Sequence, residues 1–95
     1  LMRTMRVLFV CLGNICRSPI AEAILKHRIQ NGPLRGWVQV DSAGTGDWHT
    51  GQLPDLRAQK VCQDNGILAD SRARQVTSLD FRDFDWVVAM DRQNE

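Results

Sequence analysis

The sequence predicts an α/β fold in which a parallel sheet lies between layers of helices. Three short apolar runs, at residues 6–11, 37–41 and 85–90, have the composition of strands that are covered on both faces. Two segments with helix start and stop signals, at residues 18–31 and 54–66, separate these runs. Strands that alternate with helices form βαβ units, so we expect one three-layer domain over residues 1–95.

A short loop joins the first predicted strand to the first predicted helix. The segment Arg6–Cys11 is almost continuously apolar, and the dipeptide Gly13–Asn14 then breaks it. Ser18 is a favourable N-cap and Pro19 suits the first helical position. We therefore expect a helix that begins at Ser18 and ends just before Gly32–Pro33. The apolar side of this helix should include Ile20, Ala23, Ile24 and Ile29.

The remaining elements follow in the same alternating order. Trp37–Asp41 has the pattern of a second strand, and the glycine-rich loop SAGTGDWHTG follows it. Pro54–Asp55 should begin the second helix, which ends at Gly66. Thr77–Asp80 has the pattern of a capping box and predicts one short helical turn before the third strand, at Asp85–Met90.

The composition argues against several classes of partner. The formal net charge is +1 and the basic residues form no cluster, so we expect no binding to nucleic acid. No stretch approaches the roughly eighteen consecutive apolar residues of a membrane span, and the N-terminus lacks a signal-peptide pattern. We therefore expect no membrane association and a cytoplasmic location. The three cysteines form an odd set, which fits a reducing compartment.

The loop after the first strand has the residues of a phosphate-binding site. The backbone N–H groups of Leu12–Cys16 would face inward at the N-terminus of the helix, where the helix dipole favours an anion. Asn14 accepts a left-handed backbone readily, and Arg17 would hold two phosphate oxygens with its planar fork. Cys11 would attack the phosphorus of a monoester and form a cysteinyl-phosphate, and Ser18 would donate its hydroxyl to that sulfur. This chemistry needs no metal and no cofactor.

The segment CLGNICRSPIAEA resembles the signature of the low-molecular-weight protein tyrosine phosphatases. The resemblance continues through DSAGTGDWHTG, PDLRAQ, ARQVT and FDWVVAMDRQN, and so covers nearly the whole chain. It implies a flavodoxin-like fold. It also implies hydrolysis of a phosphotyrosine-containing protein or a small aryl phosphate, with inorganic phosphate as the product.

The resemblance also implies roles for individual residues. Cys11 would be the nucleophile and Arg17 the phosphate-binding arginine, while Ser42 would support the loop. Trp48 and His49 would line the substrate cleft, where an aromatic wall would stack on a phosphotyrosine ring. Ile15 matches the tyrosine-directed branch, whereas relatives that resemble protein arginine phosphatases carry threonine there. The phosphate-binding residues implied in this way are Leu12, Gly13, Asn14, Ile15, Cys16, Arg17 and Ser18, of which Asn14 and Ser18 also brace the loop.

The sequence departs from the family pattern in its C-terminal part. The family's general acid is an aspartate in an Asp-Pro motif, and no Asp-Pro dipeptide occurs here, so we find no general acid. The last strand and the C-terminal helix of the family are missing too. We therefore expect a truncated domain, reduced turnover of poor leaving groups, and self-association through an exposed sheet edge. Ser71 stands near a position where relatives often carry a histidine that helps to hold the loop asparagine.

Other interpretations stay open beside this one. The chain could be a non-catalytic fragment that binds phosphate or a phospho-ligand, because the general acid is absent. A thiol-dependent arsenate reductase is less favoured, since no cysteine follows Cys62. Cys16 could form a reversible disulfide with the nucleophile, as the resemblance implies, or could shape the loop as a small buried side chain. Cys62, Trp37 and Trp86 are expected to pack in the fold, and Asp91 is a candidate for a supporting role.

Overall fold

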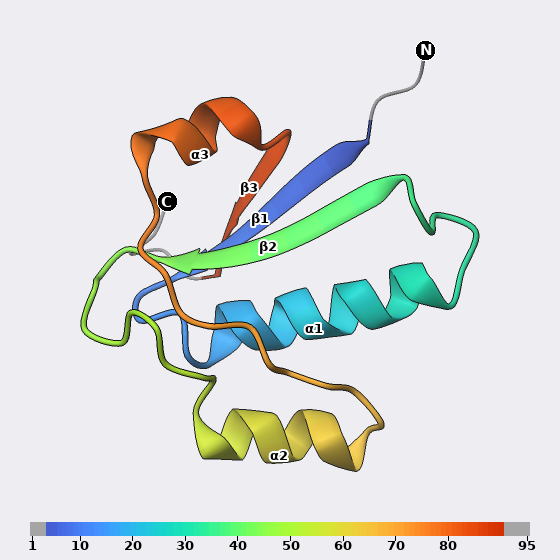
Figure 1. Ribbon diagram of the computed structural model, residues 1–95, viewed down its shortest axis with the longest axis horizontal. Coiled ribbons are helices and arrows are strands. Elements are labelled where there is room, and N and C mark those ends of the chain that lie inside the picture. The colour runs from blue at the N-terminus through green and yellow to red at the C-terminus, as the bar shows by residue number, and fades with distance from the viewer. Residues whose placement is uncertain (1–3, 91–95) are drawn as a thin grey trace.

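The computed structural model describes residues 4–90. Within this range the elements follow the order β1, α1, β2, α2, α3 and β3 (Figure 1). The predicted alternation of strands and helices is confirmed, and α3 is the helical turn that the capping box predicts. The bounds are Met5–Cys11 for β1, Arg17–Gln30 for α1, Val38–Gly44 for β2, Leu56–Asp64 for α2, Ser78–Asp83 for α3 and Trp86–Ala89 for β3.

The strands form a parallel sheet with β1 in the centre and the order β2-β1-β3. β1 pairs with β2 along its whole length, so that Cys11 lies beside Gly44 where both strands end. A parallel strand with elements on both faces must be apolar throughout. β1 meets this condition, because Leu8 is completely buried and Val10 is 3% exposed. The parallel sheet of the predicted fold class is therefore confirmed.

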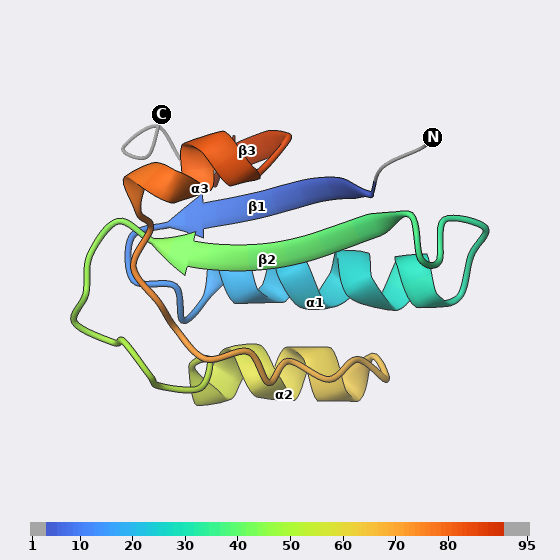
Figure 2. The same ribbon diagram turned by 45° about the horizontal axis from the view of Figure 1, so that its top comes forward.

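Helices lie on both sides of the sheet (Figure 2). α1 lies along one face, α2 lies on the outer side of α1, and α3 lies on the opposite side of the sheet. One apolar cluster consists of Leu8, Val10 and Ala43, with Val76, Phe84 and Val87 packed against it. A second cluster, formed by Ala23, Cys62 and Ala69, joins α1 to α2. Burial raises the pKa of the Cys62 thiol, as is expected for an inert core cysteine.

The prediction that Ser18 is the N-cap of the first helix is wrong. α1 begins at Arg17, and Cys16 occupies the N-cap position without a side-chain hydrogen bond to the helix. Ser18 lies inside the first turn and is completely buried. Its hydroxyl contacts the Cys11 thiol and the Asn14 amide instead of a helix N–H group, because both groups lie within hydrogen-bond distance of it.

The prediction that both tryptophans pack in the fold is also wrong. Trp37 precedes β2 and is 45% exposed, and Trp86 opens β3 and is 61% exposed. Trp86 is exposed because β3 pairs with β1 alone among the described strands, which leaves the side chains of this edge strand partly uncovered. Ile24, expected on the apolar side of the first helix, is exposed at 36%, whereas Ala23 and Ile29 are buried as predicted.

Candidate functional site

The predicted phosphate loop, residues 12–16, connects the carboxyl end of β1 to α1 (Figure 1). Loops that follow parallel strands meet at this edge of a sheet, which is where α/β folds place their ligands. The backbone N–H of Gly46, in the loop after β2, donates to the carbonyl oxygen of Leu12 at 2.9 Å. The N–H of Asp55, the N-cap of α2, donates to the carbonyl oxygen of Ile15 at 2.7 Å. Two segments distant in the sequence therefore hold the loop in place.

Cys11 is the last residue of β1 and is 5% exposed. Its Sγ lies 2.9 Å from Ser18 Oγ and accepts a hydrogen bond from the backbone N–H of Asn14 at 3.2 Å. Hydrogen bonds donated to a sulfur stabilise negative charge on it. Cys11, Cys16 and Cys62 are free thiols, and Cys16 is exposed. The interpretation of Cys16 as a small buried side chain is therefore wrong.

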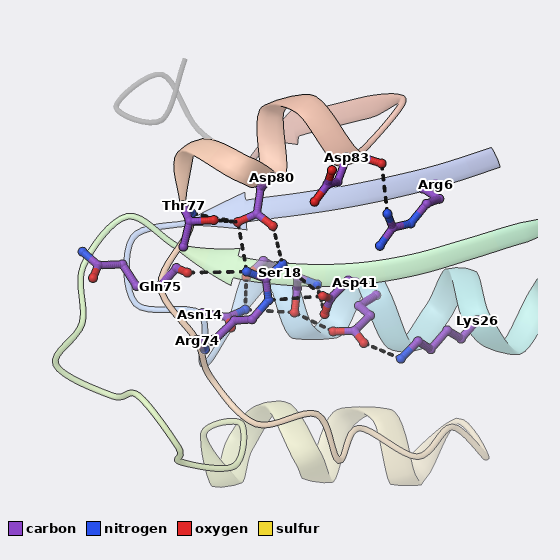
Figure 3. A network of polar contacts seen from close by, with 12 residues as sticks. Arg6, Asn14, Ser18, Lys26, Asp41, Arg74, Gln75, Thr77, Asp80 and Asp83 are labelled. Atoms are coloured by element: carbon purple, nitrogen blue, oxygen red, sulfur yellow. Dashed lines mark hydrogen bonds and ion pairs between the residues drawn. The ribbon is translucent and has the colours of Figure 1, made fainter. Parts of the chain in front are cut away.

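Asn14 braces the loop from inside (Figure 3). It is 3% exposed and has a left-handed backbone, with φ of 57°. Its Nδ2 donates to Ser18 Oγ at 2.7 Å and to Ser42 Oγ at 2.9 Å. Its Oδ1 accepts a hydrogen bond from the backbone N–H of Arg74 at 3.0 Å. One amide side chain therefore connects the loop to α1, to β2 and to the segment before α3.

A buried carboxylate lies behind this asparagine. Ser42 Oγ donates to Glu22 Oε1, and Lys26 Nζ donates to Glu22 Oε2, one turn further along α1. Glu22 is 2% exposed. A buried charge is tolerated only when it is paired and hydrogen-bonded, and both oxygens of Glu22 meet this requirement. Sequence reasoning missed Glu22, although its position four residues after Ser18 places both on one helix face.

Arg74 forms a second ionic cluster beside the loop (Figure 3). Its guanidinium contacts both oxygens of Asp80 at 3.0 Å and Asp41 Oδ2 at 3.0 Å. The hydrogen bond to Asp80 raises the pKa of Arg74, although burial opposes the rise, and Asp41 adds to it. Burial alone would raise the pKa of Asp80, but the hydrogen bonds from Arg74 and Thr77 bring it below its usual value. Asp80 also completes the capping box of α3, as predicted.

A hollow of about 230 Å³ opens at the loop. Among residues 4–90, the backbone N–H groups of Gly13, Ile15 and Cys16 make no hydrogen bond to another group. The first turn of α1 contains no acidic residue, so its dipole is not opposed there. These features favour a bound anion. A larger hollow, of about 440 Å³ between α1 and α2, shares no residue with the first. The hollow at the loop is lined by Cys11, Leu12, Gly13, Ile15, Cys16 and Arg17.

His49 borders the loop from the segment after β2, and Trp48 precedes it in the same segment. The His49 ring lies against Gly13, since a β-carbon at Gly13 would lie 3.0 Å from His49 Cδ2. His49 Nδ1 also contacts Gln52 Oε1 at 2.9 Å. The Trp48 ring is 66% exposed and covers Gly46, where a β-carbon would lie 1.9 Å from the ring. The hollow at the loop is not lined by Trp48 or His49, so their role in a substrate cleft stays a prediction.

Ser71 does not take the place of the histidine that helps to hold the loop asparagine in relatives. Ser71 is half-buried, and no hydrogen bond joins its side chain to Asn14 within residues 4–90. The backbone N–H of Arg74 holds the asparagine oxygen instead. Sequence reasoning missed Arg74 and Asp41, although a charged residue such as Asp41 inside a strand of a parallel sheet was a signal for an ion pair. Asp91, the candidate for a supporting role, lies outside the described residues.

No group of three or more His, Cys, Asp or Glu side chains in residues 4–90 is arranged to hold a metal ion. None of the helices in this range is both long enough and apolar enough to cross a membrane.

The fold and the site together define an α/β protein whose cysteine-containing loop opens at the N-terminus of a helix. A family model for low molecular weight phosphotyrosine protein phosphatases matches residues 6–95. The chain belongs to this family, and the predicted resemblance is confirmed.

Curated relatives show the same likeness. The chain is 45% identical over 93 residues to the low molecular weight phosphotyrosine protein phosphatase of Schizosaccharomyces pombe, which covers 97% of this chain and 60% of the relative. It is 49% identical over 89 residues to the low molecular weight protein-tyrosine-phosphatase YfkJ of Bacillus subtilis, which covers 93% of this chain and 57% of the relative. The chain therefore spans less than two thirds of the length of these relatives.

Solved structures agree with the fold. A protein tyrosine phosphatase from Entamoeba histolytica has a TM-score of 0.92 and 52% identity, over 96% of this chain and 58% of that one. A Drosophila arginine phosphatase has a TM-score of 0.90 and 44% identity, over 95% of this chain and 57% of that one. The flavodoxin-like fold class implied by the resemblance is thereby confirmed.

Proposed function

We propose that this chain carries the catalytic loop of a phosphotyrosine protein phosphatase that works through a cysteinyl-phosphate. The observation that carries the proposal is the position of Cys11. Its Sγ lies at the base of the anion-favouring hollow, 2.9 Å from the Ser18 hydroxyl and 3.2 Å from the Asn14 N–H. The names of the curated relatives support the same reaction.

The proposed reaction has two steps. In the first, the Cys11 thiolate attacks the phosphorus of an aryl phosphate, so that the S–P bond forms and the P–O bond to the aryl group breaks. The loop N–H groups and Arg17, which lines the hollow, stabilise the charge on the equatorial oxygens. In the second, water attacks the phosphorus, the S–P bond breaks, and inorganic phosphate leaves. Ser18 donates to the sulfur as negative charge returns to it.

An aryl substrate fits the surroundings of the loop. The imidazole of His49 lies against Gly13, which lines the hollow, and the exposed ring of Trp48 follows the same loop segment, so both would be able to stack on a phosphotyrosine ring. Ile15, which lines the hollow, supports tyrosine over arginine, because the family resemblance implies that relatives directed to phosphoarginine carry threonine there. A side-by-side assay of a phosphotyrosine peptide and a phosphoarginine peptide tests this choice. Faster hydrolysis of phosphoarginine would contradict it.

The first experiment compares p-nitrophenyl phosphate with phenyl phosphate. The nitrophenolate leaves without protonation, whereas the phenolate needs a general acid, and no Asp-Pro dipeptide is present in the 95 residues. We expect cleavage of the activated ester alone, and its loss in Cys11→Ser. Absence of cleavage by a folded chain that still binds inorganic phosphate would replace the proposal by the binding-fragment function.

Self-association is part of the same proposal. β3 is an edge strand within the described sheet, and its residues Trp86 and Val88 are 61% and 38% exposed. Apolar edge strands tend to pair with another chain. Sedimentation equilibrium should show a dimer that dissociates in Trp86→Lys but persists in Trp37→Lys, which changes an exposed tryptophan away from this edge. A monomer at all concentrations would refute this part.

We further propose a cytoplasmic location and partners that are phosphoproteins rather than nucleic acid or membranes. The proposed reaction requires a reduced Cys11, and the net charge of +1 offers no long-range attraction to nucleic acid or anionic lipid. Cell fractionation with thiol labelling tests the location, and recovery of the chain in an oxidising compartment would contradict it.

A further inference from the structure

A line of four hydrogen bonds connects the buried carboxylate of Glu22 to the sulfur of Cys11. Glu22 accepts from Ser42, Ser42 accepts from Asn14, Asn14 also donates to Ser18, and Ser18 contacts Cys11. These residues are almost completely buried, with exposures between 0% and 5%. Water is therefore kept from replacing any link in the line, so the direction of each hydrogen bond follows from the partners that the protein supplies.

The orientation of the Asn14 amide group sets the donor and acceptor roles along this line of hydrogen bonds. The backbone N–H of Arg74 can only donate, so the oxygen of the Asn14 amide must face it. The NH2 group then faces Ser18 and Ser42 and donates one hydrogen to each. Each serine oxygen therefore accepts from Asn14, and each serine keeps one hydrogen to donate elsewhere.

The hydroxyl hydrogen of Ser42 is donated to Glu22. An ionised carboxylate can only accept, so Ser42 donates to Glu22 Oε1 and turns its lone pairs to Asn14. Lys26 holds the other carboxylate oxygen and compensates the buried charge. Without this acceptor, Ser42 would carry an unsatisfied buried hydrogen and would rotate, and the Asn14 amide would lose a fixed partner.

The other hydrogen to be placed is the hydroxyl hydrogen of Ser18. The usual alternative acceptor of a helical serine is the backbone carbonyl four residues before it, but Ser18 is the second residue of α1, so that residue, Asn14, lies outside the helix. While Asn14 Nδ2 donates to Ser18 Oγ, the Ser18 hydrogen is directed to Cys11 Sγ, 2.9 Å away. We propose that Glu22 is a positioning residue that acts through Ser42 and Asn14 to aim the Ser18 hydroxyl at the Cys11 sulfur.

This inference rests on the proposed role of Cys11 as nucleophile, but it predicts a property that can be measured without turnover. Alkylation by iodoacetamide consumes only the thiolate. Its rate against pH therefore gives a midpoint at which half of Cys11 carries the negative charge. Tandem mass spectrometry of the peptide that contains both Cys11 and Cys16 assigns the adduct to one of them.

Three variants separate the proposed role from other effects. Glu22→Met removes the acceptor, Glu22→Gln removes the charge but keeps an acceptor for Ser42, and Ser42→Ala breaks the line while leaving Glu22 in place. The matched control is Ile29→Val, a buried change in α1 outside the line. The other charged or titratable groups on the elements that carry or flank the line are unchanged in all four variants. They include Arg17, Lys26, His27 and Arg28 on α1, Asp41 on β2, Arg74 before α3, and Asp80, Arg82 and Asp83 on α3.

We expect Glu22→Met and Ser42→Ala to raise the alkylation midpoint by about one pH unit, a tenfold loss of thiolate at a fixed lower pH. Glu22→Gln should stay close to the unsubstituted chain, and so should the control. A nearby anion by itself disfavours a second negative charge. A lower midpoint in both Glu22 variants would therefore mean that Glu22 acts only through its charge, which would overturn the proposal.

An unchanged midpoint in a folded Glu22→Met or Ser42→Ala chain would overturn the proposal as well. If Glu22→Met does not fold, the alkylation midpoint of Ser42→Ala tests the proposal, because removing one hydroxyl disturbs the core less than replacing a buried carboxylate. Failure of the proposed function has a different signature. In that case the midpoints would shift as expected, while p-nitrophenyl phosphate would not be cleaved by the unsubstituted chain.

Discussion

Replacement of Asn14 tests how much of the loop depends on one side chain. Two substitutions form a matched pair. Asn14→Gly removes the three side-chain hydrogen bonds, to Ser18, to Ser42 and from Arg74, but tolerates the left-handed backbone at φ of 57°. Asn14→Ala removes the same hydrogen bonds, and alanine tolerates a left-handed backbone less well than asparagine or glycine.

The expected loss in the free energy of unfolding follows from these hydrogen bonds and from the backbone conformation. Each buried hydrogen bond contributes about 1 kcal/mol to the free energy of unfolding, so Asn14→Gly should lose about 3 kcal/mol. A left-handed backbone costs alanine about 1 kcal/mol more than it costs asparagine or glycine, so Asn14→Ala should lose about 4 kcal/mol. These losses are a large fraction of the roughly 5–15 kcal/mol that stabilises a typical domain. They correspond to a lower Tm by about 15 °C and about 20 °C.

Urea unfolding followed by tryptophan fluorescence and by far-ultraviolet circular dichroism measures both losses. Saturating inorganic phosphate should raise the Tm of the unsubstituted chain more than that of either Asn14 variant, because phosphate binds the assembled loop. A loss below about 1 kcal/mol in Asn14→Ala would refute the reasoning, since it would mean that the hydrogen bonds contribute little. A glycine variant that is less stable than the alanine variant would refute the assignment of strain.

Three further changes test other parts of the site. Gly44→Ala should cost about 1–3 kcal/mol, because a β-carbon there would lie 2.9 Å from the backbone oxygen of Leu12, which cannot move aside without shifting the loop. Gly46→Ala should change the unfolding free energy by less than about 0.5 kcal/mol, since it displaces only the exposed ring of Trp48, but it should raise the KM for aryl phosphates. Asp80→Asn should flatten the dependence of stability on pH: the folded pKa of Asp80 is lowered, so its contribution is present above the unfolded value near 3.9 and is lost as the pH falls through the folded value.

Urea unfolding of the two glycine variants side by side should separate them, and equal losses would contradict the distinction between a fixed backbone neighbour and a mobile ring. Unfolding between about pH 5 and pH 2 measures the carboxylate contribution. A slope as steep in Asp80→Asn as in the unsubstituted chain would show that other carboxylates account for acid unfolding.

The local elements could be predicted from the sequence because their signals act over a few residues. The continuous apolar run of β1 indicates a central parallel strand, and Thr77–Asp80 indicates the cap of α3. The loop between Cys11 and Arg17 could be placed for the same reason, since a strand, a glycine turn and a helix start follow one another directly. These features depend on backbone preferences and hydrophobic periodicity, which neighbouring residues determine.

The tertiary structure decided which side chains support the loop. Ser18 has the residue type of an N-cap, but Cys11 and Asn14 lie within hydrogen-bond distance and engage its hydroxyl instead. Glu22 and Arg74 are residue types that usually lie on the surface. Glu22 is nevertheless buried behind Ser42, and the backbone N–H of Arg74 holds Asn14. A polar side chain is buried or exposed according to partners that come from other elements. The sequence by itself determines the cysteine, the loop and the order of the elements, whereas the direction of the hydrogen bonds that reach the sulfur is decided only when α1, β2 and the segment before α3 meet.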